Sequence, residues 1–459
     1  MSNRPKANRR TVLSMAGLGL VGSGTAIAKR TANSTSSSKS VLAEYDDDST
    51  VDIDTDAWPQ SRFDNGNTSY SPNGSPPEGS LSEAWSYDGV YHGPIVSDET
   101  VLVTRIDDPG LVALNATDGS ERWSVDVDFR KWGTNLAVAD GTVYVTANGS
   151  SSYNTESGID VNSEGMTYAF DIEDGTELWS ANAGGFSPKI TDEFVVVAGD
   201  AGPAAIARED GTVHWEHDFA VTEYYAVAHG MVYASDDYEG TLYAIDVETG
   251  ETRWTRDFDR GGSLIATEGE VVASVYDTLY VLEPESGETR WQQTFEKPDV
   301  NDPSAPWPGI GIACAVTDDA IYIGRQKFYA FDIETGDRRT LSEDGYYTNS
   351  VHGDEFYELD ETSDGEIQLV GRDVDTFQVV RRRTLPSQDY TGALVTSQTV
   401  YGMIEGSDNT FQLVALRPSD DGTHGEDGSD ESGDSENSDD SDSPNGSDDD
   451  GHGDSDDDC

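Results

Sequence analysis

Carboxylates are the most abundant side chains in this sequence that could do chemistry. The 459 residues include 89 Asp and Glu against 28 Lys and Arg, which gives a net charge of −61. Asp52, Asp54 and Asp56 follow the spacing at the start of a calcium-binding loop. However, Ala57 stands where that loop needs Gly, and Phe63 where it needs Glu. The spacing therefore favours a solvated acidic linker, and no other carboxylate can be chosen as a catalytic base or metal ligand.

The thiol chemistry of the chain is limited because the sequence has only two cysteines, Cys314 and Cys459. This number excludes a disulfide framework, a zinc site of four thiolates and a C-x-x-C-H attachment site for haem. Cys314 lies in the apolar run 312–316, where we expect a buried and unreactive thiol. Cys459 is the last residue of an acidic segment, and no role follows from its position.

Aromatic side chains recur in short segments between the apolar runs of the chain. Tyrosine, tryptophan and arginine are favoured at binding interfaces because they combine apolar area with hydrogen-bonding groups. The candidates for a ligand-binding face are Tyr91, Trp132, Tyr225, Trp307 and Tyr347. Basic residues accompany them at His92, Arg130, Lys131, Arg260 and Lys297. An alternative interpretation is that these rings fill the gaps between neighbouring structural units.

The elements that must position these rings are repeats of one hairpin. In the segment LYAIDVETGETRW, the side chains alternate along a strand that ends at Asp246. Gly250 then stands where a tight turn requires a positive φ, and Trp254 follows it on the return strand. The same spacing occurs at Gly119 and Trp123, Gly175 and Trp179, Gly211 and Trp215, Gly250 and Trp254, and Gly287 and Trp291. Gly336 keeps the turn, but Thr340 replaces the tryptophan.

A second hairpin precedes each of these, so each unit is predicted to contain four antiparallel strands. The third strands are expected at 111–115, 167–171, 204–208, 241–246, 279–283, 328–332, 367–370 and 411–416. The last unit lacks a fourth strand, but residues 81–87 supply a matching one, and pairing it with 411–416 would close a ring. Units of about 42 residues predict an all-β, eight-bladed β-propeller. Seven blades are the alternative, because the unit around 350–385 is degenerate.

The repeat resembles the tryptophan-docking motif of the pyrroloquinoline quinone (PQQ)-like propellers, which include BamB-type assembly factors and quinoprotein alcohol dehydrogenases. Residues 244–254 carry the motif A-x-D-x-x-T-G-x-x-x-W. The resemblance implies that each tryptophan packs between two blades and fixes one to the next. The segment that begins Trp58-Pro59, with Asp64 and Asn67-Thr68, also resembles the lead-in of many exported members. The resemblance covers residues 57–418, the expected propeller domain.

The same resemblance implies two classes of function. Dehydrogenases of this family hold PQQ near a disulfide between adjacent cysteines, with a calcium ion, whereas other members are non-catalytic scaffolds. This sequence has no adjacent cysteine pair. We therefore expect an exported binding or scaffold module without a cofactor. A PQQ- and calcium-dependent dehydrogenase is the alternative.

The order of strands predicts which face would bind a ligand. In a four-stranded meander, the connections from second to third strand emerge on the same side as those between units. The two longest insertions, 148–165 and 296–309, are of these two types. The candidate aromatic residues also lie where the chain enters a new unit. We therefore expect any ligand or partner to bind this side of the propeller.

The two ends of the chain are expected to lie outside the propeller. Residues 1–28 have the features of a twin-arginine signal peptide, because Arg9 and Arg10 precede a short apolar run and a small-residue cleavage site. Residues 29–56 read as an acidic, Ser- and Thr-rich linker, and 419–459 as a disordered acidic tail. We therefore expect a protein that is exported to the cell surface or the medium and does not span the membrane.

The charge balance indicates the conditions in which the protein works. A net charge of −61 in a chain with 35 % apolar residues fits a salt-adapted protein, because concentrated salt screens the repulsion between hydrated carboxylates. We expect a halophilic archaeal source. The scarcity of basic residues argues against nucleic-acid binding. The expected partner is an unidentified protein or cell-surface component, and the chain itself is expected to be a monomer.

Overall fold

The computed structural model describes residues 59–60, 62–72, 76–90, 93–97, 99–105, 110–127, 135–147, 165–221, 225–236, 238–295, 313–324, 328–342, 350–387, 389–405 and 411–419. All of them belong to one compact unit, Asp48–Cys459. The predicted signal peptide and linker, and the tail beyond Ser419, lie outside these residues. Every regular element in the described ranges is a β-strand. No helix there is long and apolar enough to cross a membrane.

The strands follow one another in groups of four, named here first to fourth. The first strands are β3 (Ile95–Ser97), β7 (Asn135–Ala139), β11 (Phe186–Ile190), β15 (Ala226–Ala228), β19 (Ser263–Ala266), β23 (Ala313–Val316), β27 (Ser350–His352) and β31 (Tyr390–Val395). The second strands are β4 (Thr100–Arg105), β8 (Thr142–Ala147), β12 (Phe194–Ala198), β16 (Met231–Ser235), β20 (Val271–Val275), β24 (Ala320–Gly324), β28 (Glu355–Glu361) and β32 (Val400–Glu405).

The third and fourth strands continue each meander outward. The third strands are β5 (Gly110–Asn115), β9 (Met166–Asp171), β13 (Ala204–Ala207), β17 (Thr241–Asp246), β21 (Thr278–Leu282), β25 (Phe328–Asp332), β29 (Ile367–Asp373) and β33 (Phe411–Pro418). The fourth strands are β6 (Glu121–Asp126), β10 (Glu177–Ala181), β14 (Val213–Glu216), β18 (Thr252–Asp257), β22 (Thr289–Thr294), β26 (Arg338–Ser342), β30 (Val379–Thr384) and, from an earlier part of the chain, β2 (Leu81–Val90). The expected third strands are thus confirmed.

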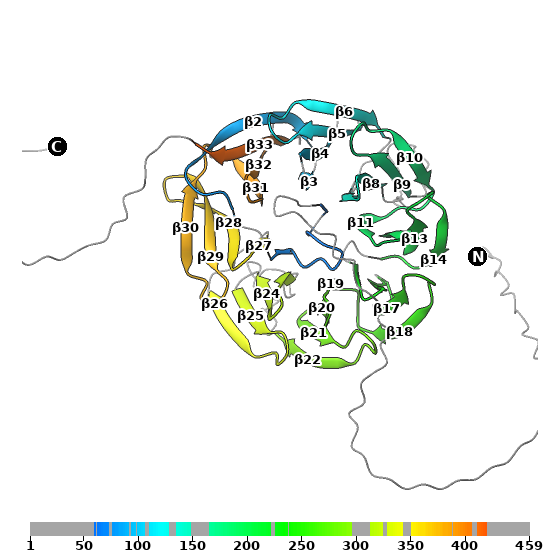
Figure 1. Ribbon diagram of the computed structural model, residues 1–459. Helices are drawn as coiled ribbons and strands as arrows, with labels where there is room; N and C mark the ends of the chain where they lie inside the picture. The colour runs from blue at the N-terminus through cyan, green and yellow to red at the C-terminus, as the bar shows by residue number, and fades with distance from the viewer. Residues whose placement is uncertain are drawn as a thin grey trace, which may run out of the picture. The chain divides into compact units, whose positions relative to one another are not determined.

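The described strands form antiparallel sheets that radiate from a common centre in a propeller-like arrangement (Figure 1). Five sheets have four strands, and a sixth adds the short strand β1 (Tyr70–Ser71) in parallel to β27. The remaining sheet runs β31-β32-β33-β2-β4-β5-β6, with β3 paired to β4. Strand β2 pairs with β33 as expected, so that Trp85 lies opposite Ala415. Among the described strands, backbone pairing between the two halves of this sheet is limited to Val90 and Arg105.

The burial of each strand follows from its place in the sheet. All five residues of β20 are buried, because both faces of an inner strand pack against neighbouring sheets. Strand β18 instead alternates exposed and half-buried residues, as expected for a strand at the rim. The core lies between sheets: Tyr233 of β16 packs in one cluster with Leu264 of β19 and Ala273 of β20. Contacts between successive units therefore stabilise the fold.

Candidate functional site

Each tryptophan of the repeat docks on the turn of the following unit. The indole Nε1 of Trp215 donates a hydrogen bond of 2.7 Å to the backbone oxygen of Val247. Its ring lies so close to Gly250 that a Cβ atom there would be 2.6 Å from Trp215 Cγ. The same bond joins Trp85 to Ala116, Trp123 to Ile172, Trp179 to Arg208, Trp215 to Val247, Trp254 to Pro284 and Trp291 to Ile333. These tryptophans pack between units, as the resemblance implies.

The aspartate of the repeat stabilises its turn. Asp246 accepts hydrogen bonds of 2.9 Å from the backbone N–H and the hydroxyl of Thr249. Its other carboxylate oxygen lies 2.6 Å from the guanidinium of Arg253. Although burial acts to raise the pKa of Asp246, the hydrogen bonds from Arg253 and Thr249 hold that pKa below its ordinary value. This carboxylate therefore has a structural role in the turn.

One turn departs from the pattern. Phe377 occupies the position of the turn glycine, with a φ of 58°, in the unit that follows Thr340. Its ring is buried and stacks on Phe328 of the preceding unit, with 4.5 Å between ring centroids. A turn that receives no tryptophan from the preceding unit thus carries a large side chain itself.

The described residues 59–60 and 62–71, here called the central segment, pass the first strands of successive units. The segment includes β1 and lies near the centre of the arrangement (Figure 1). Backbone N–H groups of five first strands donate to its backbone oxygens: Val138 to Pro59, Val227 to Asn65, Ala266 to Gly66, Val316 to Thr68 and Val351 to Ser69. The sequence identified these residues as a lead-in but gave no indication of their position.

A buried lysine lies beside the central segment. The side chain of Lys189 is fully buried, and its Nζ donates to Oδ1 of Asn67 at 2.6 Å and to the backbone oxygen of Asp64 at 3.3 Å. Burial lowers the pKa of Lys189 to about 7, although the nearby Asp64 acts to raise it. Burial likewise raises the pKa of Asp64, against the effect of its hydrogen bonds with Thr68. Sequence analysis missed this cluster, because its members are far apart in the chain.

The predicted aromatic face is only partly within the described residues. Tyr225 is fully buried, and its hydroxyl donates to the backbone oxygens of Ser187 at 2.7 Å and Val196 at 3.0 Å. The prediction that Tyr225 is on an exposed face is wrong, because its hydroxyl ties the sheet of β15 to the preceding sheet. The alternative, a ring that fills the gap between units, is correct for this residue. The other candidates lie outside the described residues: Tyr91, Trp132, Trp307 and Tyr347.

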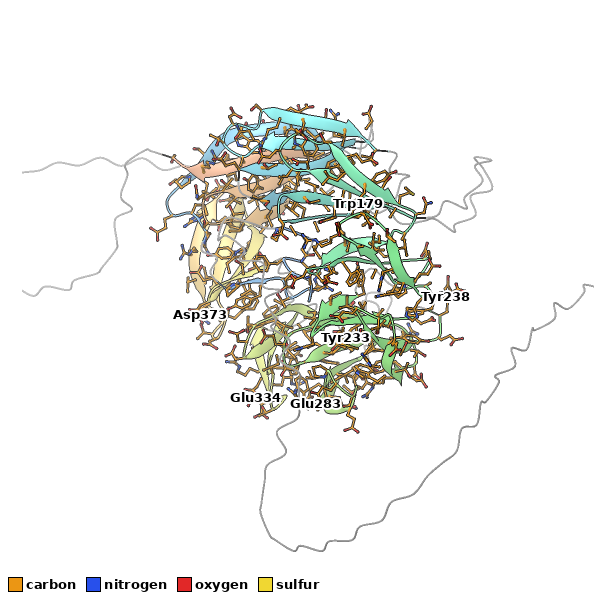
Figure 2. The ribbon with its side chains drawn as sticks, turned by 45° about the vertical axis from the view of Figure 1, so that its right-hand side comes forward. Trp179, Tyr233, Tyr238, Glu283, Glu334 and Asp373 are labelled. Atoms are coloured by element: carbon orange, nitrogen blue, oxygen red, sulfur yellow. The ribbon has the colours of Figure 1, made fainter. Side chains whose placement is uncertain are left out.

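A cluster that includes two exposed residues lies on loops of the same face. Tyr238, between β16 and β17, is 86 % exposed and lies at the edge of the molecule in Figure 2. The guanidinium of Arg260, between β18 and β19, lies 4.8 Å from the ring of Tyr276. A Cβ atom on Gly240 would be 2.6 Å from the Cα of Arg260, so the loops of Tyr238 and Arg260 touch. We call Tyr238, Arg260 and Tyr276 the Tyr238 patch.

Sequence analysis recognised Arg260 but missed the two tyrosines of the patch. Tyr238 and Tyr276 both lie in connections from a second to a third strand, which the predicted topology places on the candidate face. The position of these tyrosines in such connections is the signal by which sequence analysis could have found them. Their exposure, by contrast, depends on how neighbouring loops pack.

The family resemblance implies a calcium and PQQ site only for its dehydrogenases. No three His, Cys, Asp or Glu side chains gather in a metal-binding group within the described ranges. The first strands around the centre are engaged by the central segment. We therefore derive no redox step from the residues described there.

Comparison with known proteins identifies the family. Residues 75–184 and 163–382 match the family model described as outer membrane protein assembly factor BamB. The chain belongs to this family. In this chain the repeat of tryptophan and glycine belongs to the framework, and the fold by itself does not fix the function.

Curated relatives match shorter stretches of the chain. The serine/threonine-protein kinase AfsK of Streptomyces griseus is 28 % identical over 178 residues, which cover 34 % of this chain and 20 % of AfsK. BamB of Yersinia pestis is 26 % identical over 183 residues, which cover 35 % of this chain and 42 % of that protein. The chain thus spans well under half the length of these curated relatives.

Solved structures show the same fold at low sequence identity. A europium-containing methanol dehydrogenase aligns with a TM-score of 0.55 and 13 % identity, over 79 % of this chain and 98 % of that chain. The quinohemoprotein alcohol dehydrogenase of Comamonas testosteroni aligns with a TM-score of 0.55 and 12 % identity, over 79 % and 80 %. These values establish a common fold and leave the activity of this BamB-family chain open.

Proposed function

We propose that this BamB-family propeller is an exported, non-catalytic module that binds a protein or cell-surface component through the Tyr238 patch. The observation that carries the proposal is the 86 % exposure of Tyr238, on a loop that touches the loop of Arg260, whose guanidinium pairs with the ring of Tyr276. An aromatic ring this exposed gains little from folding, whereas aromatic and Arg side chains contribute strongly to binding partners. Family membership supports the same interpretation.

The proposal includes a closed ring of eight blades. The sheet that contains β2 and β33 then counts as two blades, because Val90 and Arg105 are the one backbone pair described between its halves. Pairing of β2 with β33 joins the N-terminal part of the chain to its last unit and covers the sheet edges. A ring closed in this way holds the loops of one face at fixed positions, as a binding platform requires.

The proposed setting is outside the cell in concentrated salt. The twin-arginine sequence at Arg9 and Arg10 supports export of the folded chain, and the net charge of −61 supports salt adaptation. A surface with this charge favours partners that can be bound without a cluster of basic residues on this chain. The apolar and cation–π character of the Tyr238 patch meets that condition, because salt screens charges more than it weakens apolar contacts.

Cross-linking from the cell surface tests the proposal. Purified protein is incubated with a cell-surface extract in molar KCl, cross-linked and analysed by mass spectrometry. We expect one component to bind the native protein and to be lost about tenfold or more from the double variant Tyr238→Ala, Arg260→Ala. Leu178→Ala is the matched control, because Leu178 is 52 % exposed on β10 at the rim. Equal recovery with both variants would contradict the assigned face.

A redox assay tests the competing function. PQQ and calcium are added to the purified protein in high salt, and dye reduction is followed with alcohols as substrates. We expect neither a bound chromophore nor dye reduction. Alcohol-dependent reduction of the dye would replace the proposed binding function with dehydrogenase activity.

A further inference from the structure

We infer that the centre of this propeller is a peptide-binding site, which the central segment of the same chain fills. The segment is held by contacts typical of a bound peptide: backbone hydrogen bonds, anchored amide side chains and one position that only glycine fits. The covalent link between the segment and β2 contributes none of these contacts.

The site is a row of equivalent backbone donors. Each first strand that contacts the segment uses the N–H at the same place in its hairpin, as Val227 and Ala266 illustrate: each stands three residues before a glycine of the turn, Gly230 and Gly269. Ile190 makes the equivalent bond to the side-chain oxygen of Asn65, at 2.9 Å. The repeat therefore creates a converging set of donors, and without a ligand these inward-facing groups would lack protein acceptors.

Two asparagines of the central segment bind the site through side-chain hydrogen bonds. Asn65 accepts from the N–H of Ile190 and donates back to its carbonyl oxygen at 2.5 Å. Asn67 donates to the carbonyl oxygens of Tyr225 at 2.6 Å and Leu264 at 3.2 Å, and accepts from Lys189 at 2.6 Å. These bonds reach three different sheets, so they specify both the identity and the register of the peptide.

The residue between these asparagines must be glycine. A Cβ atom on Gly66 would lie 1.9 Å from the backbone oxygen of Ala266, which belongs to an inner strand and cannot easily move. Four non-glycine residues of the segment have positive φ: Arg62, Phe63, Asn67 and Ser69. Such conformations are strained for L side chains, so contacts with the surrounding strands must maintain them. The site therefore takes a turned peptide segment that contains Asn-Gly-Asn.

Cleavage of the full-length protein tests whether the segment is a ligand in its own right. A specific protease site is inserted between Tyr70-Ser71-Pro72 and β2, within 73–75, and the folded protein is cut in high salt. We expect the N-terminal fragment to remain with the propeller through gel filtration. A labelled synthetic peptide of residues 58–72, added in excess, should then exchange into the cut protein and not into the uncut protein.

Variant peptides distinguish specific binding of the segment from trapping of the cleaved fragment in the propeller. Peptides with Gly66→Ala or Asn67→Ala should exchange at least tenfold less than the native peptide. Pro72→Ala is the matched control, because Pro72 is exposed at the end of the segment. Because substitutions are confined to the added peptide, the folding of the propeller is not affected. Loss of the fragment from a cut protein that stays folded, or equal exchange of all peptides, would overturn the inference.

Discussion

At the scale of single residues, the turn glycines are explained by two separate requirements. Gly250 has a φ of 70°, which L side chains rarely adopt, and its face is covered by Trp215. Gly230 has a similar φ of 64° but nothing lies within 4 Å of a Cβ placed on it. The chain therefore offers an internal comparison between backbone strain and steric exclusion.

Alanine substitutions at three glycines should separate these two costs. Gly269→Ala, at a position with neither a positive φ nor a close neighbour, should change stability by less than about 0.5 kcal/mol. Gly230→Ala should cost about 1 kcal/mol from backbone strain alone. Gly250→Ala should cost at least 1–3 kcal/mol more, because it displaces Trp215. Denaturant unfolding in high salt measures all three, and equal losses at Gly230 and Gly250 would contradict the docking role.

His352 should make stability depend on pH. Its side chain is buried between Ser350, whose Oγ lies 2.9 Å from Nε2, and the ring of Tyr357. Burial lowers the pKa of His352 from 6.5 to about 4. The unfolded chain therefore binds a proton that the native protein does not between these values, and stability is lost as the pH falls from about 6.5 toward 4.

Replacement of the histidine isolates this contribution from that of the many carboxylates. The loss specific to His352 should approach about 3 kcal/mol at pH 4. His352→Gln should lower stability at pH 7 but flatten its decline between pH 6.5 and pH 4.5. Denaturant midpoints of both proteins across this range give the difference. Parallel declines would show that the histidine is not buried in its neutral form.

At the scale of elements, the contact between one unit and the next is the feature that the repeat conserves. A tryptophan on a fourth strand and a glycine in the next turn form one structural pair, although they belong to different hairpins. Strand β26 carries Thr340 in the tryptophan position, and the next turn carries Phe377 in the glycine position. Both halves of the pair are replaced together, and Phe377 packs on Phe328 of the preceding unit instead.

Introducing the tryptophan and the glycine together should recover part of the stability that each single substitution loses. Phe377→Gly removes a buried ring and should cost about 3–5 kcal/mol. Thr340→Trp alone should also destabilise, because Phe377 already fills the contact. The double variant should be more stable than the sum of the single effects by at least about 1 kcal/mol. Strict additivity in a double-mutant cycle would show that the two positions do not form a pair.

At the scale of the whole molecule, the charge should make stability depend on salt. The net charge of −61 includes 89 acidic side chains, and turn carboxylates such as Asp332 and Asp373 accept local hydrogen bonds from backbone N–H groups. Repulsion among the remainder opposes the compact state unless salt screens it. The free energy of unfolding should therefore rise between about 0.2 M and 3 M KCl.

Comparison of two salts gives the control for this expectation. KCl and NaCl at equal ionic strength should stabilise the protein to a similar degree if screening is the main cause. The thermal midpoint, measured by circular dichroism, follows the effect. A midpoint that is independent of salt concentration would contradict salt adaptation and the proposed setting of the protein.

The sequence by itself determined the strand pattern and the repeat. Alternating side chains, turn glycines and tryptophans at fixed spacing are local signals, and they predicted the third strands and the pairing of 81–87 with 411–416. It also marked the motif aspartate and tryptophan as repeated, and therefore as more typical of a framework than of a single site. Arg260 was predicted to lie on the candidate binding face because it lies in a connection between two units.

Only the tertiary structure decided which side chains meet. The position of the central segment and the cluster around Lys189 depend on contacts between residues that are more than a hundred positions apart. The burial of Tyr225 depends on contacts with the preceding sheet. Such contacts leave no periodic signal, because each is made once and its partners come from different units. The exposure of Tyr238 is equally a property of packing, since the sequence shows a tyrosine in a loop but not whether neighbouring loops cover it.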